Sequence, residues 1–199
     1  HRKIILPQLG APGVNAFEVT GRTGFKVEYG PIRAADLPAY LKTGKADPEM
    51  RLAKFTIADR IVLIPVEVVS SLLPAIVLAI AAFLAGGPAM ALGAVIAFFG
   101  GAVLFPVLLP YLPTKDYSSR GMILGILLAL PFAACEYAFS KEMTIATAAS
   151  MLAYLLIMPS VTGYLSLNFT GATPFPSRTG VRKEIYTYIP AMAVMAGLG

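Results

Sequence analysis

The sequence predicts an α-helical polytopic membrane domain of about five transmembrane helices, preceded by a short α/β segment. Hydrophobic residues make up 57% of the 199 residues and charged residues only 14%, with a mean hydropathy of +0.73. This is far more apolar than a soluble domain of that length. Ten of the 16 Lys and Arg residues lie within the first 60 positions, and long stretches after them carry no charge. The two regions are therefore suited to different solvents.

The first region, residues 1–57, has alternating strand and helix signals. Strand-like runs at 3–6 and 25–29 enclose a turn rich in glycine and proline and a short helix at 16–20. Asp36 is placed to cap a second helix that ends at Gly44, and Asp47 with Pro48 repeats that start signal. A segment of about 55 residues cannot bury an independent core.

The second region, residues 58–199, contains the membrane spans. Apolar runs that are suited to about 30 Å of hydrocarbon lie near 61–85, 89–109, 121–139, 143–167 and 185–199. Gly86, Gly87 and Pro88 predict a tight turn between the first two spans. Small residues recur in the spans, which predicts close packing between helices. The last run is short for a span and the first residue is His1, so we expect a fragment truncated at both ends.

The Lys and Arg residues of the connections predict the orientation. These residues are frequent before the first span, absent from the first connection, and frequent again in the second and fourth connections. By the positive-inside rule, we expect a multi-pass protein of the cytoplasmic (inner) membrane. The N-terminal domain would then be cytoplasmic, and the C-terminus would lie on the far side.

The sequence excludes several classes of site. Cys135 is the only cysteine and His1 the only histidine, so a disulfide framework within the chain, a multi-Cys or multi-His metal site and a Ser-His-Asp triad cannot form. No glycine-rich phosphate-binding pattern follows a strand. We therefore assign no catalytic residue and no metal ligand to this sequence.

Three single residues in the spans are candidates for a functional role. Glu67 is either an acid at the level of the interface or a contact for an ion, a proton or a substrate. Glu136 fits an interfacial role near the end of the third span. Cys135 fits a small apolar filler, and the alternative is a thiolate ligand for a soft metal.

Two polar segments are also open to two interpretations. Residues 168–184 predict a structured turn on the cytoplasmic side. The cations of this segment are Arg178, Arg182 and Lys183. In one interpretation they only set the topology, and in the other they bind phosphate, anionic headgroups or the soluble domain. Residues 8–14, after the first strand, are either a bare turn or a backbone surface that lines a flat cofactor at strand ends.

Four stretches carry a family resemblance: ILPQLGAPGV at 5–14, GFKVEYGPIRAADLPAYL at 24–41, MRLAKFTIADRIVLIPVE at 50–67 and LNFTGATPFPSRTGVRKE at 167–184. Together they resemble the membrane-bound corrinoid proteins of microbial mercury methylation, along the whole chain. The resemblance implies a methyltransferase in which cobalamin, a corrinoid held by a Rossmann-like cytoplasmic domain, passes a methyl group to Hg(II) and gives methylmercury. It also implies a ferredoxin-like iron-sulfur protein as electron donor. Residues 1–57 would be the C-terminal fragment of the corrinoid-binding domain.

The resemblance assigns cofactor-binding residues at two places. They are Gln8, Leu9, Gly10, Ala11, Pro12, Gly13 and Val14, together with Tyr29, Gly30 and Pro31. The family's cap-helix sequence N-[VI]-W-C-A-[AG]-G-K, whose cysteine coordinates cobalt, is absent, and the chain has no Trp. We expect that segment upstream of His1, with most cobalamin contacts outside this chain, and we do not place Cys135 in its role. This fragment alone is expected to be inactive.

Two alternatives stay open. One is a membrane-anchored corrinoid methyl carrier for another acceptor, like those of the acetyl-CoA pathway. The other is a small membrane transporter, which would need ionisable residues at mid-membrane depth in facing spans, and only Glu67 comes near this. The expected partners are the lipid bilayer, Hg(II) as substrate and the iron-sulfur protein, with no nucleic acid.

Overall fold

The computed structural model describes residues 2–140, 142–172 and 178–199. The chain divides into two compact units, His1–Phe55 and Thr56–Gly199, where the sequence placed a boundary after residue 57. The first unit contains a small sheet and short helices, and the second is helical.

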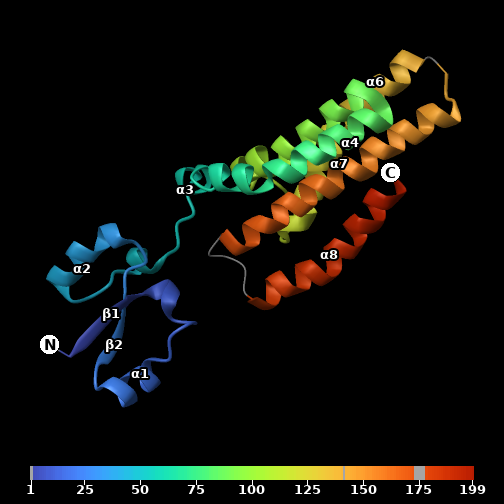
Figure 1. Ribbon diagram of the computed structural model, residues 1–199. Coiled ribbons are helices and arrows are strands. Elements are labelled where there is room, and N and C mark those ends of the chain that lie inside the picture. Colours follow the sequence, from blue (N-terminus) through green and yellow to red (C-terminus); the bar gives the residue numbers. More distant parts are fainter. Residues whose placement is uncertain (1, 141, 173–177) are drawn as a thin grey trace. The chain divides into compact units, whose positions relative to one another are not determined.

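The first unit is built on a strand-helix-strand segment (Figure 1). Strand β1 (Lys3–Pro7) is followed by a 3-10 turn, η1 (Gln8–Gly10), and by helix α1 (Ala16–Thr23). Strand β2 (Lys26–Gly30) then pairs with β1 in parallel, from Lys3 opposite Lys26 to Pro7 opposite Gly30. Because the strands are parallel, their carboxyl ends meet at one edge of the sheet.

Local caps set the limits of the helices in this unit. The Asn15 side chain accepts hydrogen bonds from Phe17 N (3.1 Å) and Glu18 N (3.3 Å) at the start of α1. Helix α2 (Leu37–Thr43) ends at Gly44, whose φ of 64° suits glycine. The predicted capping by the Asp36 side chain is wrong. A 3-10 turn, η2 (Ala34–Asp36), runs directly into α2 and gives Asp36 a helical backbone, unlike the extended backbone of a capping residue.

The first unit has a very small core. After α2 it continues through one more 3-10 turn, η3 (Pro48–Arg51), whose preceding Asp47 makes no side-chain cap. Tyr40 is the one large hydrophobic side chain that is buried among the residues described in this unit. The strand pairing and the contacts around β2 therefore hold this unit together more than apolar burial does.

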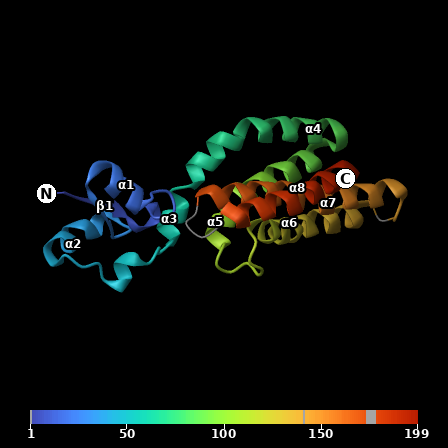
Figure 2. The ribbon, with the colours of Figure 1, turned by 90° about the horizontal axis from the view of Figure 1, so that it is seen from below.

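The second unit begins with a helical hairpin. Helix α3 (Ile57–Ile61) starts at a capping box of Thr56 and Asp59, and α4 (Ile64–Phe99) follows. Within α4, Gly87 has φ 76° and ψ −162°, a backbone conformation that is essentially restricted to glycine. Figure 2 shows α4, coloured from teal to green, turning back on itself.

Contacts across the hairpin agree with this reversal. Val68 and Ala75 of the first arm pack against the cluster of Phe98 and Ala102 beyond the turn. Nearer the open end, Arg60 Nη1 donates to the carbonyl oxygens of Pro106 and Val107 at 3.3 Å. The hairpin therefore has two antiparallel arms that lie side by side: residues 64–86, and residues 88–99 with the helical turns that follow them. The chain reverses at the predicted turn, Gly86 to Pro88.

The remaining helices complete the bundle. A π-helical turn, η4 (Gly100–Leu104), and α5 (Phe105–Leu108) end the hairpin. Helices α6 (Tyr117–Ser140), α7 (Ile145–Ala172) and α8 (Arg178–Leu198) follow. Three segments of the described chain are long and apolar enough to cross a membrane: Ile57–Leu108, Tyr117–Ser140 and Ile145–Gly171. The chain is thus a mostly helical protein suited to a membrane.

Two sequence predictions differ from this arrangement. The polar turn predicted over 168–184 is largely helical, because α7 continues to Ala172 and α8 begins at Arg178 instead of Ile185. Residues 173–177 of that predicted turn lie outside the described residues. Since α8 starts with charged residues, it is not among the three apolar segments.

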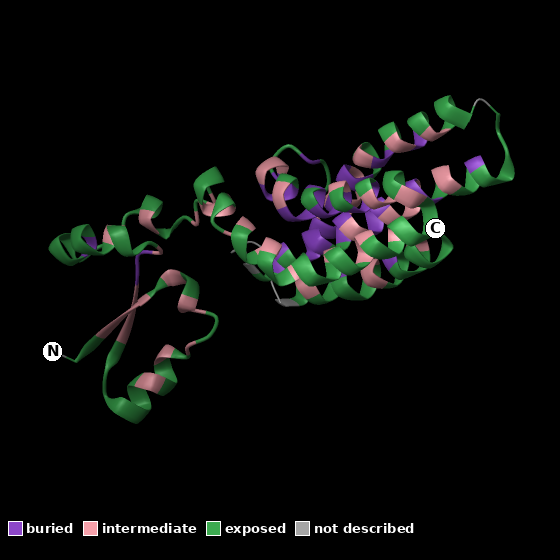
Figure 3. Ribbon diagram, turned by 45° about the horizontal axis from the view of Figure 1, so that its top comes forward, coloured by how far each residue is buried: buried purple, intermediate pink, exposed green. Residues whose placement is uncertain are grey.

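Helices α6 and α7 make the closest contact in the bundle. A Cβ added at Gly125 would strike Thr162 Oγ1 and the Pro159 backbone, and one at Gly121 would strike the Ser166 side chain. Thr162 Oγ1 donates to Met158 O at 2.9 Å and Ser166 Oγ to Thr162 O at 2.6 Å, so these buried hydroxyls are satisfied within α7. Figure 3 shows buried residues gathered in the helical unit. Small residues here allow the close backbone approach that membrane helices use.

Helix α8 is fastened to the start of α6 by a buried carboxylate. Glu184 accepts hydrogen bonds from Tyr117 N (3.1 Å), Ser118 N (2.9 Å) and Ser118 Oγ (3.0 Å). Tyr188, one turn later, donates its hydroxyl to Asp116 at 3.0 Å. The first N–H groups of a helix have no partner within it, and a negative charge at that end is favourable. This contact joins the first turns of α8 to the start of α6.

The tight contact between α6 and α7 predicts the effect of one methyl group. We expect Gly125→Ala to lower the free energy of unfolding by about 1–3 kcal/mol, because the added Cβ must displace the backbone of α7. Thermal unfolding of the purified protein in detergent micelles measures the change. The control is Gly197→Ala, since a Cβ at Gly197 meets nothing within 4 Å. Equal effects of the two substitutions would contradict the packing described here.

Candidate functional site

The two segments with predicted cofactor-binding residues meet at the carboxyl edge of the sheet. Pro7 pairs with Gly30 at the end of the strands, so the turn at Gln8 begins beside the end of β2. At the other end of the turn, the Tyr29 hydroxyl donates to Val14 O at 2.7 Å. Residues 8–14 and 29–31 therefore form one continuous edge, although 14 residues of turn and helix separate them in the sequence.

Close packing behind this edge fixes the end of β2. A Cβ at Gly30 would lie 2.8 Å from Ile5 Cγ2 and 3.5 Å from the Tyr40 ring, so a larger residue there would have to displace the Ile5 side chain. The Tyr40 hydroxyl donates to Glu28 Oε1 at 2.7 Å, and Lys3 Nζ lies 2.6 Å from Glu28 Oε2. Glu28 thus joins β1, β2 and α2.

These contacts shift three ionisation equilibria. The hydrogen bonds from Lys3 and Tyr40 lower the pKa of Glu28 below its ordinary value of 4.5. The same carboxylate, through its hydrogen bond and its charge, raises the pKa of Lys3 above 10.5. The hydrogen bond to Glu28 and burial raise the pKa of Tyr40 above 10.0. All three shifts favour the ionised Glu28 and Lys3 with a neutral Tyr40.

The outer surface of this edge consists of backbone and apolar side chains. A Cβ at Gly13 would meet only Gly10 O at 3.7 Å, so the backbone of the turn can be approached closely. Leu9 is about half exposed, at 52%. Next to the turn lies a pocket of about 320 Å³, with apolar walls that include Leu6, Pro7, Pro31 and Ile32.

This surface fits one wall of a flat corrin ring, and the described residues of the first unit include no cysteine or histidine. Exposed glycine backbone and Leu9 suit close contact with a flat macrocycle. Within the described ranges, no group of three or more His, Cys, Asp or Glu side chains could hold a metal ion. Cys135 is a free, exposed cysteine of α6, which belongs to the second unit.

In the second unit, Glu67 faces another helix. Its Oε1 accepts a hydrogen bond from Ser71 Oγ at 3.0 Å and one from Asn168 Nδ2 at 2.9 Å. Through this contact with α7, Glu67 lies within the helical bundle, where it is half buried. Glu136, the other acid singled out in the spans, is half buried near the end of α6.

Sequence reasoning missed two residues because it placed both in a loop. Asn168 lies in α7, and a signal for it existed: Ser160, Tyr164 and Asn168 recur at four-residue intervals and so share one helix face. Glu184 lies in α8, and no local pattern distinguishes an acid that caps a distant helix.

The predicted cations of segment 168–184 have local contacts where they are described. The Arg182 guanidinium lies 5.5 Å from the centroid of the Tyr186 ring. Lys183 Nζ lies 3.9 Å from Asp116 Oδ2. The side chain of Arg178 lies outside the described part of the structure. No shared anion site is formed by Arg182 and Lys183 in these contacts.

Comparison with known proteins adds no relative to these observations: no family model, no curated protein and no solved structure matches the chain.

The Glu28 contacts predict a loss of order in acid. The lowered pKa of Glu28 means that its contribution to stability is present above pH 4.5 and is lost as the pH falls through the lowered pKa. We expect hydrogen-exchange protection of the β1 and β2 amides, corrected for intrinsic exchange, to fall below pH 4.5.

Glu28→Gln should lower this protection at neutral pH and remove its acid dependence. The matched control is Glu18→Gln on α1, whose carboxylate pairs with Arg22 at 2.7 Å on the helix surface. An unchanged acid profile in Glu28→Gln would show that the network does not hold the strands.

Proposed function

We propose that this chain is the membrane anchor and one wall of the corrinoid site of a corrinoid-dependent methyltransferase, which transfers a methyl group to Hg(II) and gives methylmercury. The observation that carries the proposal is the meeting of residues 8–14 and 29–31 at the carboxyl edge of the sheet. These segments belong to the stretches through which the sequence resembles the corrinoid proteins of mercury methylation.

The location of the edge supports a role in cofactor binding. In α/β sheets, ligands bind outside the carboxyl ends of the strands, and the first unit is interpreted as a fragment of a Rossmann-like domain. The backbone at Gly10 and Gly13 would lie against the ring, and Leu9 would give apolar contact. Tyr29 would hold the turn in place through Val14. A bound corrinoid supplies the methyl group, and these residues bind and orient it.

The helical unit would anchor the site at the membrane. Counting the two arms of the α4 hairpin separately and adding α6, α7 and α8 gives the five spans of the proposal. The distribution of Lys and Arg then places the first unit in the cytoplasm. There it would be accessible to Hg(II) and to a ferredoxin-like iron-sulfur protein that donates electrons.

A corrinoid methyl carrier for another acceptor would use the same edge, and only the product distinguishes it. Transport is less well supported. The partner of Glu67 across the helix contact is the amide of Asn168, which does not ionise, whereas transport pathways use facing ionisable groups.

Corrinoid content tests the proposal. The protein is expressed from its natural gene, with all flanking sequence, in cells supplied with cobalamin, and the bound corrinoid is measured by absorbance after purification. Gly13→Phe should lower corrinoid retention about tenfold, because a bulky side chain on the wall costs about 1–3 kcal/mol of contact.

The control for this experiment is Gly21→Phe on α1, where a Cβ meets nothing within 4 Å and lies outside the predicted wall. It should retain corrinoid like the parent protein. Methylmercury formed from Hg(II) then separates a mercury methyltransferase from another methyl carrier. A natural protein that binds no corrinoid, or equal retention in both variants, would contradict the proposed site.

A further inference from the structure

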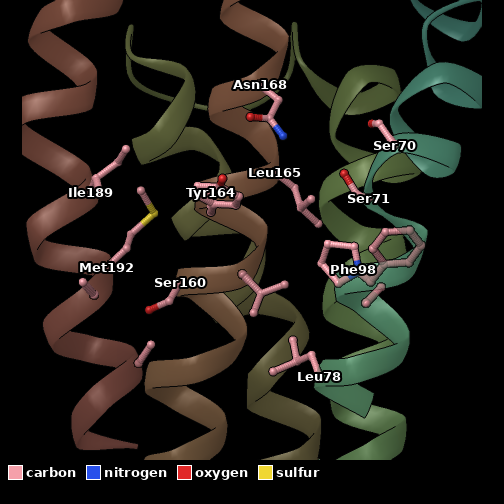
Figure 4. Close-up of a pocket in the computed structure, with 15 residues that line it drawn as sticks. Ser70, Ser71, Leu78, Phe98, Ser160, Tyr164, Leu165, Asn168, Ile189 and Met192 are labelled. Atoms are coloured by element: carbon pink, nitrogen blue, oxygen red, sulfur yellow. The ribbon is translucent and has the colours of Figure 1, made fainter. Parts of the chain in front are cut away.

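The largest cavity described in the helical unit lies among the first arm of α4, α7 and α8 and has a volume of about 590 Å³. Its walls are apolar along most of its length. Figure 4 shows Asn168, Ser70 and Ser71 gathered toward one end of the cavity and Leu78 at the other. The cavity is therefore polar at one end and apolar at the other.

Beside the polar end lies the carboxyl group of Glu67, which is bonded to two residues of the lining, Ser71 and Asn168, and has spare capacity to accept hydrogen bonds. Both hydrogen bonds that Glu67 accepts, from Ser71 and Asn168, end on Oε1. Among the described residues, no donor is bonded to Glu67 Oε2 or to Asn168 Oδ1. The described lining contains no Lys, Arg or His. Within the apolar surroundings of a membrane, such a carboxylate attracts a cation or a strong hydrogen-bond donor.

The apolar part of the cavity continues toward the turn of the hairpin. A second cavity of about 430 Å³ shares Leu78 with the first and reaches Ala85 on α4 and Ile157 on α7. From Ser71 to Ala85 a helix rises about 20 Å. This is more than half of the about 30 Å thickness of the hydrocarbon core. The two cavities together can follow an extended chain through one leaflet.

We propose that this groove binds a membrane amphiphile with an ammonium head and a long apolar tail. The head would lie at Glu67 and Asn168, where the free acceptor oxygens are, and the tail would follow Leu78 toward Ala85. A head with a carboxylate or phosphate would bring a second negative charge to Glu67 without a described cation to compensate it. This inference does not depend on the corrinoid proposal, since it rests on the second unit alone.

Photolabelling tests the groove. The natural protein is reconstituted in phosphatidylcholine nanodiscs with a long-chain primary alkylamine that carries a diazirine at mid-tail, and the labelled residues are mapped by mass spectrometry. We expect labels on the cavity walls, at residues such as Leu165 and Met192. An unlabelled alkylamine should compete, and a fatty acid of the same chain length should not.

Two variants test the head and the tail separately. Glu67→Gln removes the charge and should lower labelling about tenfold, which corresponds to 1.4 kcal/mol. Ala193→Phe keeps Glu67 but fills the apolar wall of the cavity and should also reduce labelling. The control is Glu136→Gln, which removes a half-buried carboxylate of α6 outside this cavity and should leave labelling unchanged.

The possible results test the proposed head site and the proposed groove separately. Equal labelling in Glu67→Gln and in the parent protein, or competition by the fatty acid as strong as that by the alkylamine, would overturn the proposed head. If Glu67→Gln does not fold, the Ala193→Phe variant and the competition between amine and acid decide the question. Labelling that Ala193→Phe does not change would overturn the proposed groove.

Discussion

The helical unit depends on the close approach of α6 to α7 at Gly125. Lipid is as apolar as leucine, so membrane helices gain little from burying apolar surface and associate through close packing and hydrogen bonds. Gly125 lies against Thr162 and Pro159, and any side chain there would separate the helices. Helix α7 is consequently fixed at the centre of the bundle. Its other face, with Tyr164 and Asn168, is thereby held toward α4 and α8 and forms the wall of the large cavity.

The first unit follows a different principle. It has almost no apolar core, and a parallel strand pair with the Glu28 contacts holds the carboxyl edge in place. Polar contacts at a surface are individually weak. In the proposal, the role of this unit is to present a backbone surface at Gly10 and Gly13.

The sequence predicted features that are encoded locally. Gly44 ends a helix with positive φ, as predicted, and Gly87 reverses the chain within the predicted turn. The start of α8 was not predictable, because the residues before Ile185 are charged and the partner of Glu184, the start of α6, lies far away in the sequence. The contact of Asn168 was not predictable for the same reason, since its partner Glu67 lies on another helix. At the sheet edge, the candidate cofactor-binding residues came from the family resemblance. The parallel pairing of the strands brings these residues together. No local sequence pattern identifies the ligand that they would bind.

The most direct test of the account concerns the hairpin at Gly87, because in the proposed arrangement its two arms are separate membrane spans. In a Cys135→Ala background, single cysteines replace Lys45, Ala89 and Lys115, and a membrane-impermeant maleimide is applied to intact cells. The account predicts that the cysteine at 89 is labelled from outside, and that those at 45 and 115 are labelled only after the membrane is opened. Labelling of 89 and 115 from the same side would contradict it.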